Sequence, residues 1–435
     1  NLLALPLVLA FSITVAADMT LEEVVVTAQK TESSLQDTPI AITAITEGTI
    51  RDLNIKNVVD LQGIAPNVML LPAPANNTGA SLAIRGGVAM NPAITWEPSV
   101  GTYVDGVYMG KTQGGIWDLV DLERVEVLRG PQGTLYGRNT LAGAVNFISK
   151  KPSGDGVSGA LTIGNYGLKQ GRLIADFEIG EDVFAKLVMH NKVRDGFVKN
   201  QPGPYQPAQG VVPNNTNPIT KELDTINSKG FKFQIYYAGD KTDVDLSFDW
   251  TDQDNTPPHP QLGNMADWWA DAVGFGASPA TGGLEVAPLH KYDRLGRDSY
   301  TSLDNEMYET SVVEGWHLKI TRQTGIGELK LTLAERELDW DDQLDMDGTP
   351  HYIFHTARHT AYSSKTVELQ LTGSNDFMSY VAGYYQFNDD AFTANPQSGF
   401  LGSFVIDQKY SGGGDAKAFY AQATFDIGDK TDLTV

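Results

Sequence analysis

The sequence of 435 residues contains no cysteine. That absence excludes a disulfide-stabilised scaffold and any metal site built on thiolates. Basic residues are also scarce, because 32 Lys and Arg stand against 54 Asp and Glu, for a formal charge of −22. A chain this acidic lacks the basic surface that nucleic-acid phosphates require, so we predict no nucleic-acid partner.

Long apolar runs are absent after residue 17, so we predict no transmembrane helix. Residues 1–17 (NLLALPLVLAFSITVAA) are apolar and end in small residues, which is typical of the apolar core of a secretory signal peptide. The alternative is an N-terminal membrane anchor, although the run is short for a bilayer. No Met or basic segment precedes it, so we expect this signal peptide to be incomplete.

Catalytic signatures are missing from the most distinctive stretch, residues 121–152, which has no Ser/His/Asp set and no phosphate loop with its lysine. We therefore predict no enzyme and no cofactor. Val125 and Val127 alternate with charged neighbours, as in a strand with one buried face. A tight Arg-Gly-Pro-Gln-Gly turn follows, and a second alternating segment spans 144–148. A small αβ domain with a β-turn would also fit this pattern.

As a whole, however, residues 121–152 (DLERVEVLRGPQGTLYGRNTLAGAVNFISKKP) resemble the plug domain of TonB-dependent outer-membrane receptors. Three shorter motifs precede it in the family's order: APNV at 65–68, LAIRG at 82–86 and VGTYVDGV at 100–107. Asn67 replaces the family's Gly, but Asn tolerates positive φ. The resemblance implies a plug over residues 36–152, in which the spacing of apolar residues predicts a helix over 50–63.

A β-prone run of three valines lies between the signal segment and the plug. It could be an ordinary edge strand or a template to which a partner adds a strand. Its position resembles the family's TonB box within a linker at 18–35, which implies binding to TonB and its inner-membrane motor proteins. The residues of this box are Glu22, Glu23, Val24, Val25, Val26, Thr27 and Ala28.

Short alternating runs fill residues 153–435, as in DVDLSFDW at 243–250. Alternation fits both a soluble sandwich and a transmembrane barrel. Tight turns alternate with long links, which favours a barrel with external loops at 195–228, 253–305, 340–363 and 389–414. We count about eleven strands, half of the roughly 22 in plugged transporters. The predicted fold is an α+β plug domain followed by an antiparallel transmembrane β-barrel, truncated at about its midpoint.

The resemblance also implies contacts inside the barrel. In this family, plug arginines pair with carboxylates of the barrel wall, and Arg85 and Arg129 are the matching positions. Glu368 and Asp245 lie on polar registers of their predicted strands and are the candidate partners. Alternatively, Arg129 braces only its own turn.

Apical plug loops of the family touch the ligand, which implies a role for Met90, Trp96 and Glu97. Trp96 could instead pack against the wall. Trp268 and Trp269 lie in the longest link, where they could stack on an aromatic or sugar ligand or form that loop's own core.

Metal binding is not predicted, although two patterns invite it. His351, His355 and His359 recur every four residues, which would face one way on a helix. Asp345 and Asp347 lie in an acidic run that resembles a calcium loop only in part, because the required final Glu is missing. Loop histidines are usually solvated, so these five residues remain candidates only.

The resemblance implies a receptor in the outer membrane of a Gram-negative bacterium, embedded in its lipid. Its expected function is energy-coupled import of a scarce small-molecule ligand, with an iron chelate such as a ferric siderophore as the first candidate. Cobalamin, carbohydrates and aromatic compounds are alternative cargoes. A passive porin or adhesin barrel, or a secreted β-rich enzyme or lectin, would be a different class of protein.

Overall fold

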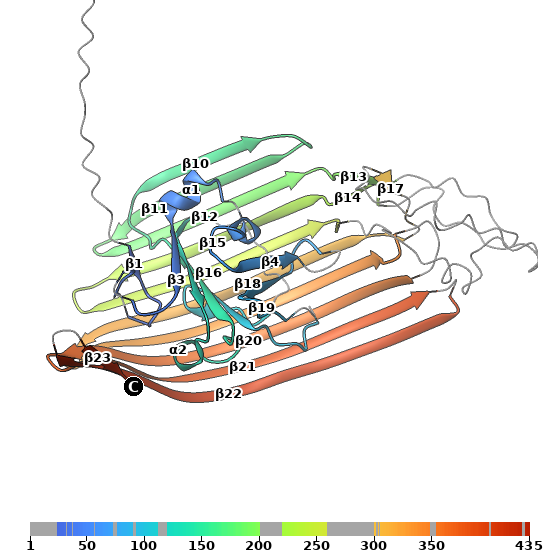
Figure 1. Cartoon of the computed structure of the whole chain (residues 1–435). Coiled ribbons are helices and arrows are strands. Elements are labelled where there is room, and N and C mark those ends of the chain that lie inside the picture. Colours follow the sequence, from blue (N-terminus) through green and yellow to red (C-terminus); the bar gives the residue numbers. More distant parts are fainter. Residues whose placement is uncertain are drawn as a thin grey trace, which may run out of the picture.

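A computed structural model provides the fold. It describes residues 24–31, 33–36, 38–55, 57–72, 76–89, 93–111, 120–200, 220–258, 300–301, 303, 305–348, 354–399, 402–428 and 431–435. Within these ranges no helix has both the length and the apolar character needed to cross a bilayer. The described chain contains two main bodies, a small mixed domain and a large curved sheet (Figure 1).

The first body, which we call the plug, is built on a five-stranded sheet in the order β3-β8-β9-β6-β7. β6 and β9 are parallel, and the other neighbours in this sheet are antiparallel. The elements from the start of the described chain to the end of the plug are β1 (Val25–Val26), β2 (Ser33–Ser34), β3 (Ile42–Thr46), α1 (Glu47–Asp52), η1 (Val58–Leu61), β4 (Val68–Pro72), β5 (Ala80–Ile84), β6 (Val100–Val104), β7 (Val107–Tyr108), β8 (Leu122–Arg129), α2 (Gly133–Tyr136) and β9 (Gly143–Ser149).

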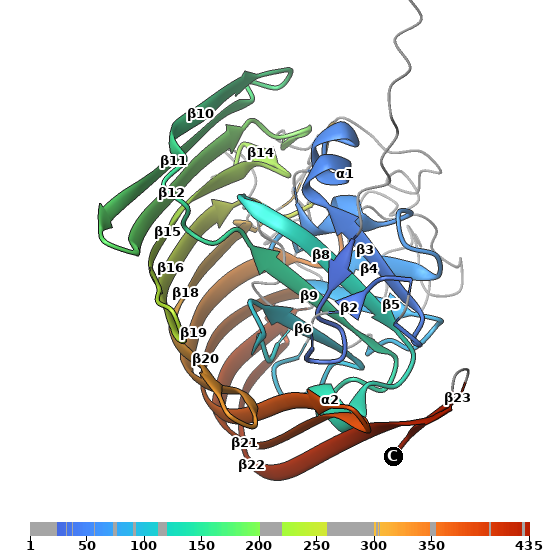
Figure 2. The ribbon, with the colours of Figure 1, turned by 90° about the vertical axis from the view of Figure 1, so that its left-hand side faces the viewer.

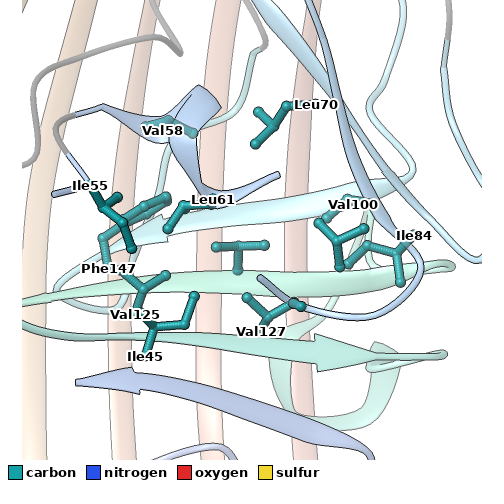
Figure 3. Packing of buried hydrophobic residues seen from close by; sticks show 13 residues of the cluster. Ile45, Ile55, Val58, Leu61, Leu70, Ile84, Val100, Val125, Val127 and Phe147 are labelled. Carbon is teal, nitrogen blue, oxygen red and sulfur yellow. The ribbon is translucent and has the colours of Figure 1, made fainter. Parts of the chain in front are cut away.

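The plug has its own apolar core between this sheet and the η1 turn (Figure 3). Val125 and Val127 of β8 face Phe147 of β9 in this core, and Val58 and Leu61 of η1 cover them. Burial of these side chains supplies the main stabilisation of a domain of this size. The alternation in the sequence thus predicts the core face of β8 correctly.

The predicted helix over 50–63 is wrong in its middle. α1 ends at Asp52, its C-cap residue Leu53 is 58% exposed, and Asn54 follows with a φ of 52°. Asn57 then starts η1 with a capping box, in which its side chain and that of Asp60 each accept a backbone N–H of the other residue. This local hydrogen bonding favours two short turns over one continuous helix.

The second body, which we call the wall, is an eleven-stranded sheet in which each strand pairs antiparallel with the next (Figure 1). This confirms the predicted strand count. The strands are β10 (Gly156–Ile163), β11 (Lys169–Gly180), β12 (Val183–Arg194), β15 (Ile226–Ala238), β16 (Thr242–Asn255), β18 (Tyr308–Thr324), β19 (Gly327–Asp345), β20 (Phe354–Asn375), β21 (Met378–Gly399), β22 (Phe404–Gly428) and β23 (Thr431–Thr434). A small separate sheet joins β13 (Val198–Asn200), β14 (Glu222–Leu223) and β17 (Tyr300–Thr301).

The two faces of the wall differ in polarity. Ser247 and Glu368 are buried on the concave face, whereas their neighbours Phe248 and Leu369 are exposed on the convex face. Figure 2 shows the plug inside the concave side of the sheet. The wall therefore points apolar side chains outward and polar ones inward, as a barrel in lipid requires and a sandwich with a dry core does not.

Two of the predicted long links are shorter than expected, because β19 continues to Asp345 and β20 begins at Phe354, while β21 continues to Gly399 and β22 begins at Phe404. The outward side chains of β19 change from Leu331 and Leu333 to acidic residues such as Glu337. The inward side chains there include the buried Leu338 and Trp340, so the alternation changes its sense, with the apolar residues now inside, although the strand pairing continues.

The lipid-facing register can be tested at Leu369. Leu369→Arg places a charge on the outward face and should lower the free energy of unfolding from a bilayer by about 2–4 kcal/mol, the cost of a charge near the midplane. Thr372→Arg, on the concave face of the same strand, is the matched control and should cost less. Urea unfolding of the receptor in lipid vesicles measures both, and equal losses would contradict the assignment of faces.

Candidate functional site

The segment that precedes the plug, residues 24–31, is bound to the plug itself. β1 pairs with β2, and Val26 and Ala28 are fully buried in a cluster that includes Leu128 of β8. The Thr27 backbone N–H donates to Glu126 Oε1 at 2.8 Å. Glu126 is itself buried and accepts a hydrogen bond from Arg124 Nε at 2.8 Å. We call residues 24–31 the leading segment.

The same segment is also bound to the wall. Lys30 Nζ lies 2.6 Å from Glu368 Oε1, and the Lys30 carbonyl accepts a hydrogen bond from Gln370 Nε2 at 3.2 Å. The Tyr420 hydroxyl donates to Glu368 Oε1 at 2.8 Å, and the Lys30 ammonium lies 5.8 Å from the Tyr420 ring centroid. The leading segment therefore connects plug and wall.

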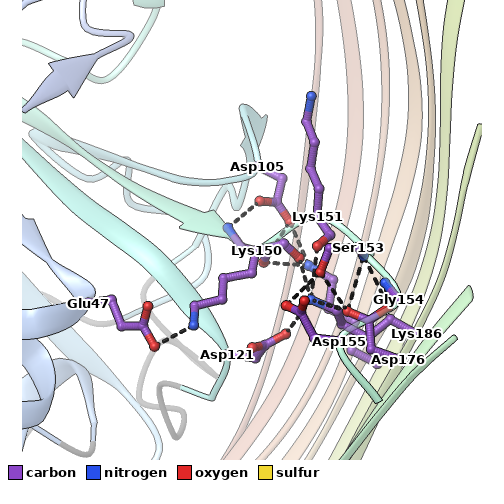
Figure 4. Close-up of polar contacts among 12 residues, drawn as sticks. Glu47, Asp105, Asp121, Lys150, Lys151, Ser153, Gly154, Asp155, Asp176 and Lys186 are labelled. Carbon is purple, nitrogen blue, oxygen red and sulfur yellow. Dashed lines mark hydrogen bonds and ion pairs between the residues drawn. The ribbon is translucent and has the colours of Figure 1, made fainter. Parts of the chain in front are cut away.

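Two plug carboxylates face lysines of the wall. Lys232 Nζ of β15 lies 2.6 Å from Asp105 Oδ2, and Lys186 Nζ of β12 lies 3.1 Å from Asp121 Oδ2. Figure 4 shows Asp105, Asp121 and Lys186 in this polar contact region between plug and wall. The Lys186 ammonium also donates to the carbonyls of Lys150 and Lys151 at the end of the plug.

Asp105 is strongly held in its charged form. Burial by itself raises the pKa of this carboxyl, but the charges of Lys232 and Lys319 outweigh burial and hold the pKa well below its usual range. Asp105 Oδ1 also accepts the Ser149 backbone N–H at 2.8 Å. The plug turn after β6 is thus fixed to the wall by the ion pair between Asp105 and Lys232.

A third contact lies at the opposite end of the plug from the leading segment. Glu309 of β18 is fully buried and accepts hydrogen bonds from the backbone N–H groups of Asn77 and Thr78 and from the Thr78 hydroxyl. Trp340 Nε1 of β19 donates to the same carboxylate at 3.2 Å. One wall carboxylate therefore accepts three hydrogen bonds from this plug turn.

The structure does not bring the proposed arginine pairs together. Glu368 pairs with Lys30, and Asp245 lies 3.5 Å from His317 Nε2 within the wall. Arg85 has a φ of 52° and lies over the turn after β8, where a Cβ on Gly130 would be 3.2 Å from its Nη1. Arg129 Nε is buried without a hydrogen-bond partner among the described residues. The predicted arginine pairing is therefore wrong. The plug residues that pair with lysines of β12 and β15 are Asp105 and Asp121.

The remaining predicted site residues are placed as follows. Trp96 is 57% exposed, and Glu97 lies beside it in contact with Lys111, Arg138 and Asn139. His355 and His359 belong to two different groups of possible ligands, with Asp345 and Asp347 in one and Asp339 and Asp341 in the other. Residues 1–17, Glu22, Glu23, Met90, Trp268, Trp269 and His351 lie outside the described residues.

The sequence reasoning missed Lys30, Lys186, Lys232 and Glu309. Lys232 was visible as a polar residue on an alternating strand, and Asp105 belongs to the Asp-Gly-Val motif. Nothing in the sequence indicated that these two side chains meet.

The sequence and the fold were compared with those of known proteins. Residues 34–144 match the family described as TonB-dependent Receptor Plug Domain. Residues 34–144 therefore form a plug domain of this family, and the chain as a whole has the fold of a receptor plug with part of its β-barrel. The similar receptors lie in the outer membrane of Gram-negative bacteria, and the outward apolar face of the wall fits the same location.

Curated relatives of the receptor include two transport proteins of Escherichia coli strain K12. The catecholate siderophore receptor Fiu is 32% identical over 165 residues, which cover 37% of this chain and 20% of Fiu. The ferrichrome outer membrane transporter/phage receptor is 31% identical over 132 residues, or 29% of this chain and 16% of that protein. The match therefore spans only a minor part of each relative's length.

Solved receptor structures share the fold over nearly the whole chain. The ferripyoverdine receptor of Pseudomonas aeruginosa superposes with a TM-score of 0.69 at 14% identity, covering 94% of this chain and 53% of that structure. The open form of Fiu from E. coli K12 superposes with a TM-score of 0.62 at 17% identity, covering 92% of this chain and 59% of that structure. The chain thus spans somewhat more than half of these structures, and at such low identity the likeness shows the fold alone.

The Asp105–Lys232 pair yields a prediction about how the plug is held. Asp105→Asn should lower the stability of the plug by about 3 kcal/mol at pH 7, because it leaves Lys232 without its partner in a buried contact. Since the pKa of Asp105 is depressed, its stabilisation is complete above the unfolded pKa of about 4 and is lost as the pH falls further. The variant should therefore lose the steep acid dependence of the wild type.

Urea unfolding of the purified receptor at pH 7 and pH 3, followed by proteolysis of the plug, measures this effect. Asp52→Asn is the matched control, because Asp52 is exposed and pairs with its neighbour Arg51. A loss of stability in Asp105→Asn that is equal at both pH values would show that the charge of Asp105 is not what holds the plug.

Proposed function

We propose that the complete receptor imports a scarce ligand across the outer membrane with energy delivered by TonB, and that the ligand is a ferric siderophore. The observation that carries this proposal is the leading segment, which is hydrogen-bonded to the plug at Glu126 and ion-paired to the wall at Glu368. A pull on this segment acts on its contact with the plug and on its contact with the wall, and neither contact requires the wall to unfold when it breaks.

TonB recognition in this proposal uses strand addition to the leading segment. Val25 is 43% exposed, but Val26 and Ala28 are buried against the plug, so the partner needs the segment to be released first. The proposed binding residues remain Glu22, Glu23, Val24, Val25, Val26, Thr27 and Ala28. The inner-membrane motor proteins supply the work through TonB.

The proposal includes a division of the chain into domains. We divide it into a signal-peptide segment at 1–17, the TonB box and linker at 18–35, the plug at 36–152 and barrel strands at 153–435. We propose no catalytic activity and no cofactor, in keeping with the curated relatives, whose names describe receptors and transporters.

The iron chelate is favoured as cargo because the relative Fiu is named a catecholate siderophore receptor and another relative a ferrichrome transporter. A third relative, from Vibrio vulnificus, is named a vitamin B12 transporter, so cobalamin is the second candidate. Trp96 in the plug and Trp268 and Trp269 in a long link are the aromatic residues that we propose to meet the ligand, together with Met90.

Deletion of residues 22–28 separates active import from passive diffusion. The deletion should abolish uptake of radiolabelled ferric siderophore by iron-starved cells while leaving binding at the cell surface intact, because the ligand site is on the other side of the plug. The exchange Val25→Pro should act in the same direction, since proline removes a backbone N–H that strand addition uses.

Val25→Thr is the matched control, because it keeps the backbone N–H and a β-branched side chain. It should retain most of the uptake. Uptake that survives the deletion at the wild-type rate would support a passive porin instead, and a protein absent from the outer-membrane fraction would support a secreted enzyme or lectin.

A further inference from the structure

Glu97 lies at the centre of a cluster of cations within the plug. Its Oε1 is 3.2 Å from Lys111 Nζ and 3.0 Å from Arg138 Nη2, and its Oε2 accepts a hydrogen bond from Asn139 Nδ2. One carboxylate thus engages two positive groups and an amide donor. Charge-assisted contacts of this kind are the ones that proteins use to bind oxygen anions.

The three groups around Glu97 are fixed by other contacts. The Lys111 side chain is only 5% exposed and lies 5.6 Å from the Tyr362 ring centroid. The Arg138 guanidinium lies 5.5 Å from the ring centroid of Phe387 on the wall. Asn139 Nδ2 also donates to the Tyr108 hydroxyl at 2.6 Å. The donor groups would therefore keep their places if the carboxylate left.

Glu97 is the least constrained member of the cluster. Its side chain is 40% exposed, and it belongs to residues 93–99, which form no helix or strand and run directly into β6. The neighbouring Trp96 is largely exposed. The carboxylate is thus the one component of the cluster that can move away into solvent.

The cluster needs an anion at all times. Burial raises the pKa of Glu97, but Lys111 and Arg138 more than offset this and lower it, so the carboxylate is ionised at neutral pH. Without it, the one carboxylate that the described residues would leave within 4 Å of the nearly buried Lys111 is Asp389 of the wall, at 3.9 Å. A buried ammonium without a close counter-ion is unfavourable, so the departure of Glu97 requires a replacement.

We propose that Lys111, Arg138 and Asn139 form an anion-binding site of the plug, which Glu97 occupies when no ligand is bound and which a ligand oxygen anion takes over. The ligand class is a solute that carries carboxylate or catecholate oxygens. This inference rests on the proposed function and deepens it, since it assigns the imported chelate a negative charge. Glu97 then competes with the ligand and does not bind it, in contrast to the role that the sequence suggested.

A purely structural salt bridge predicts a different behaviour. If Glu97 only tethered the segment 93–99, removing its charge would loosen the plug and leave ligand affinity unchanged or weaker. If Glu97 competes, removing its charge raises the affinity for anions, because no internal carboxylate has to be displaced. The sign of the change in affinity therefore separates the two.

The first test compares binding to the complete receptor in outer-membrane vesicles. The probes are an anionic ferric tris-catecholate complex and a neutral ferric trihydroxamate complex. Glu97→Gln should bind the anionic complex about tenfold more tightly, and Arg138→Gln about tenfold more weakly, with little change for the neutral complex. Glu123→Gln is the matched control, because this exposed plug carboxylate pairs with Arg124 away from the cluster.

Equal effects of Glu97→Gln on both complexes, or no effect on either, would overturn the anion site while leaving import by the wild type, and hence the proposed function, intact. If the wild type binds neither complex, the proposed cargo is wrong, and a second measurement still decides on the site.

That measurement uses a nitroxide spin label at Thr95→Cys, since residues 1–435 contain no native cysteine, in a receptor whose remaining cysteines, where it has any, are replaced by serine. Iron-free 2,3-dihydroxybenzoate should mobilise the label in the Glu97 background, and in Glu97→Gln the label should be mobile before any anion is added. A label that stays immobile in both backgrounds would overturn the inference whatever the receptor transports.

Discussion

Lipid on the convex side of the wall constrains everything on its concave side. Each strand alternates, so the outward position of Leu369 leaves Glu368 and Gln370 pointing inward. The plug therefore meets a surface rich in polar groups and must be held by charges and hydrogen bonds wherever that surface faces it. Lys186 and Lys232 provide such contacts on β12 and β15, and Glu309 provides one on β18.

The plug is nevertheless held differently on its two sides. Against β19–β22 it packs apolar groups, such as Ile94 with Trp340 and Tyr108 with Phe387. Against β12–β16 it makes ion pairs beside a cavity of about 110 Å³, whose lining includes Ser149. Polar contacts can be exchanged for water at a small net cost, whereas separating apolar surfaces carries the full cost of their hydration. Parting the plug from the wall therefore costs less per contact on the lysine side.

Alternation and motif order were sufficient to predict the plug, the strand count and the outward face of the wall. They failed where local hydrogen bonding intervened, as at Asn57, and where the apolar side chains of a strand change from the outward to the inward face, as beyond Leu333. The contacts between plug and wall were harder to predict, because a register places Lys232 on the inner face without indicating which plug turn lies opposite. Which residues pair across the interface depends on how the folded plug fits against the folded wall. The spacing of residues within either body does not contain that information.

The position of Glu126 decides how tension on the leading segment would reach the plug. Glu126 lies in β8, which is paired on both sides, with β3 and with β9. A force applied through Thr27 would therefore act on an internal strand of the plug sheet, where it must load many hydrogen bonds together, while the Lys30–Glu368 contact involves a single side-chain pair. Single polar pairs give way before cooperative sheet pairing does. Under the proposed function, the wall contact would break first, and the plug would begin to move with its sheet still folded.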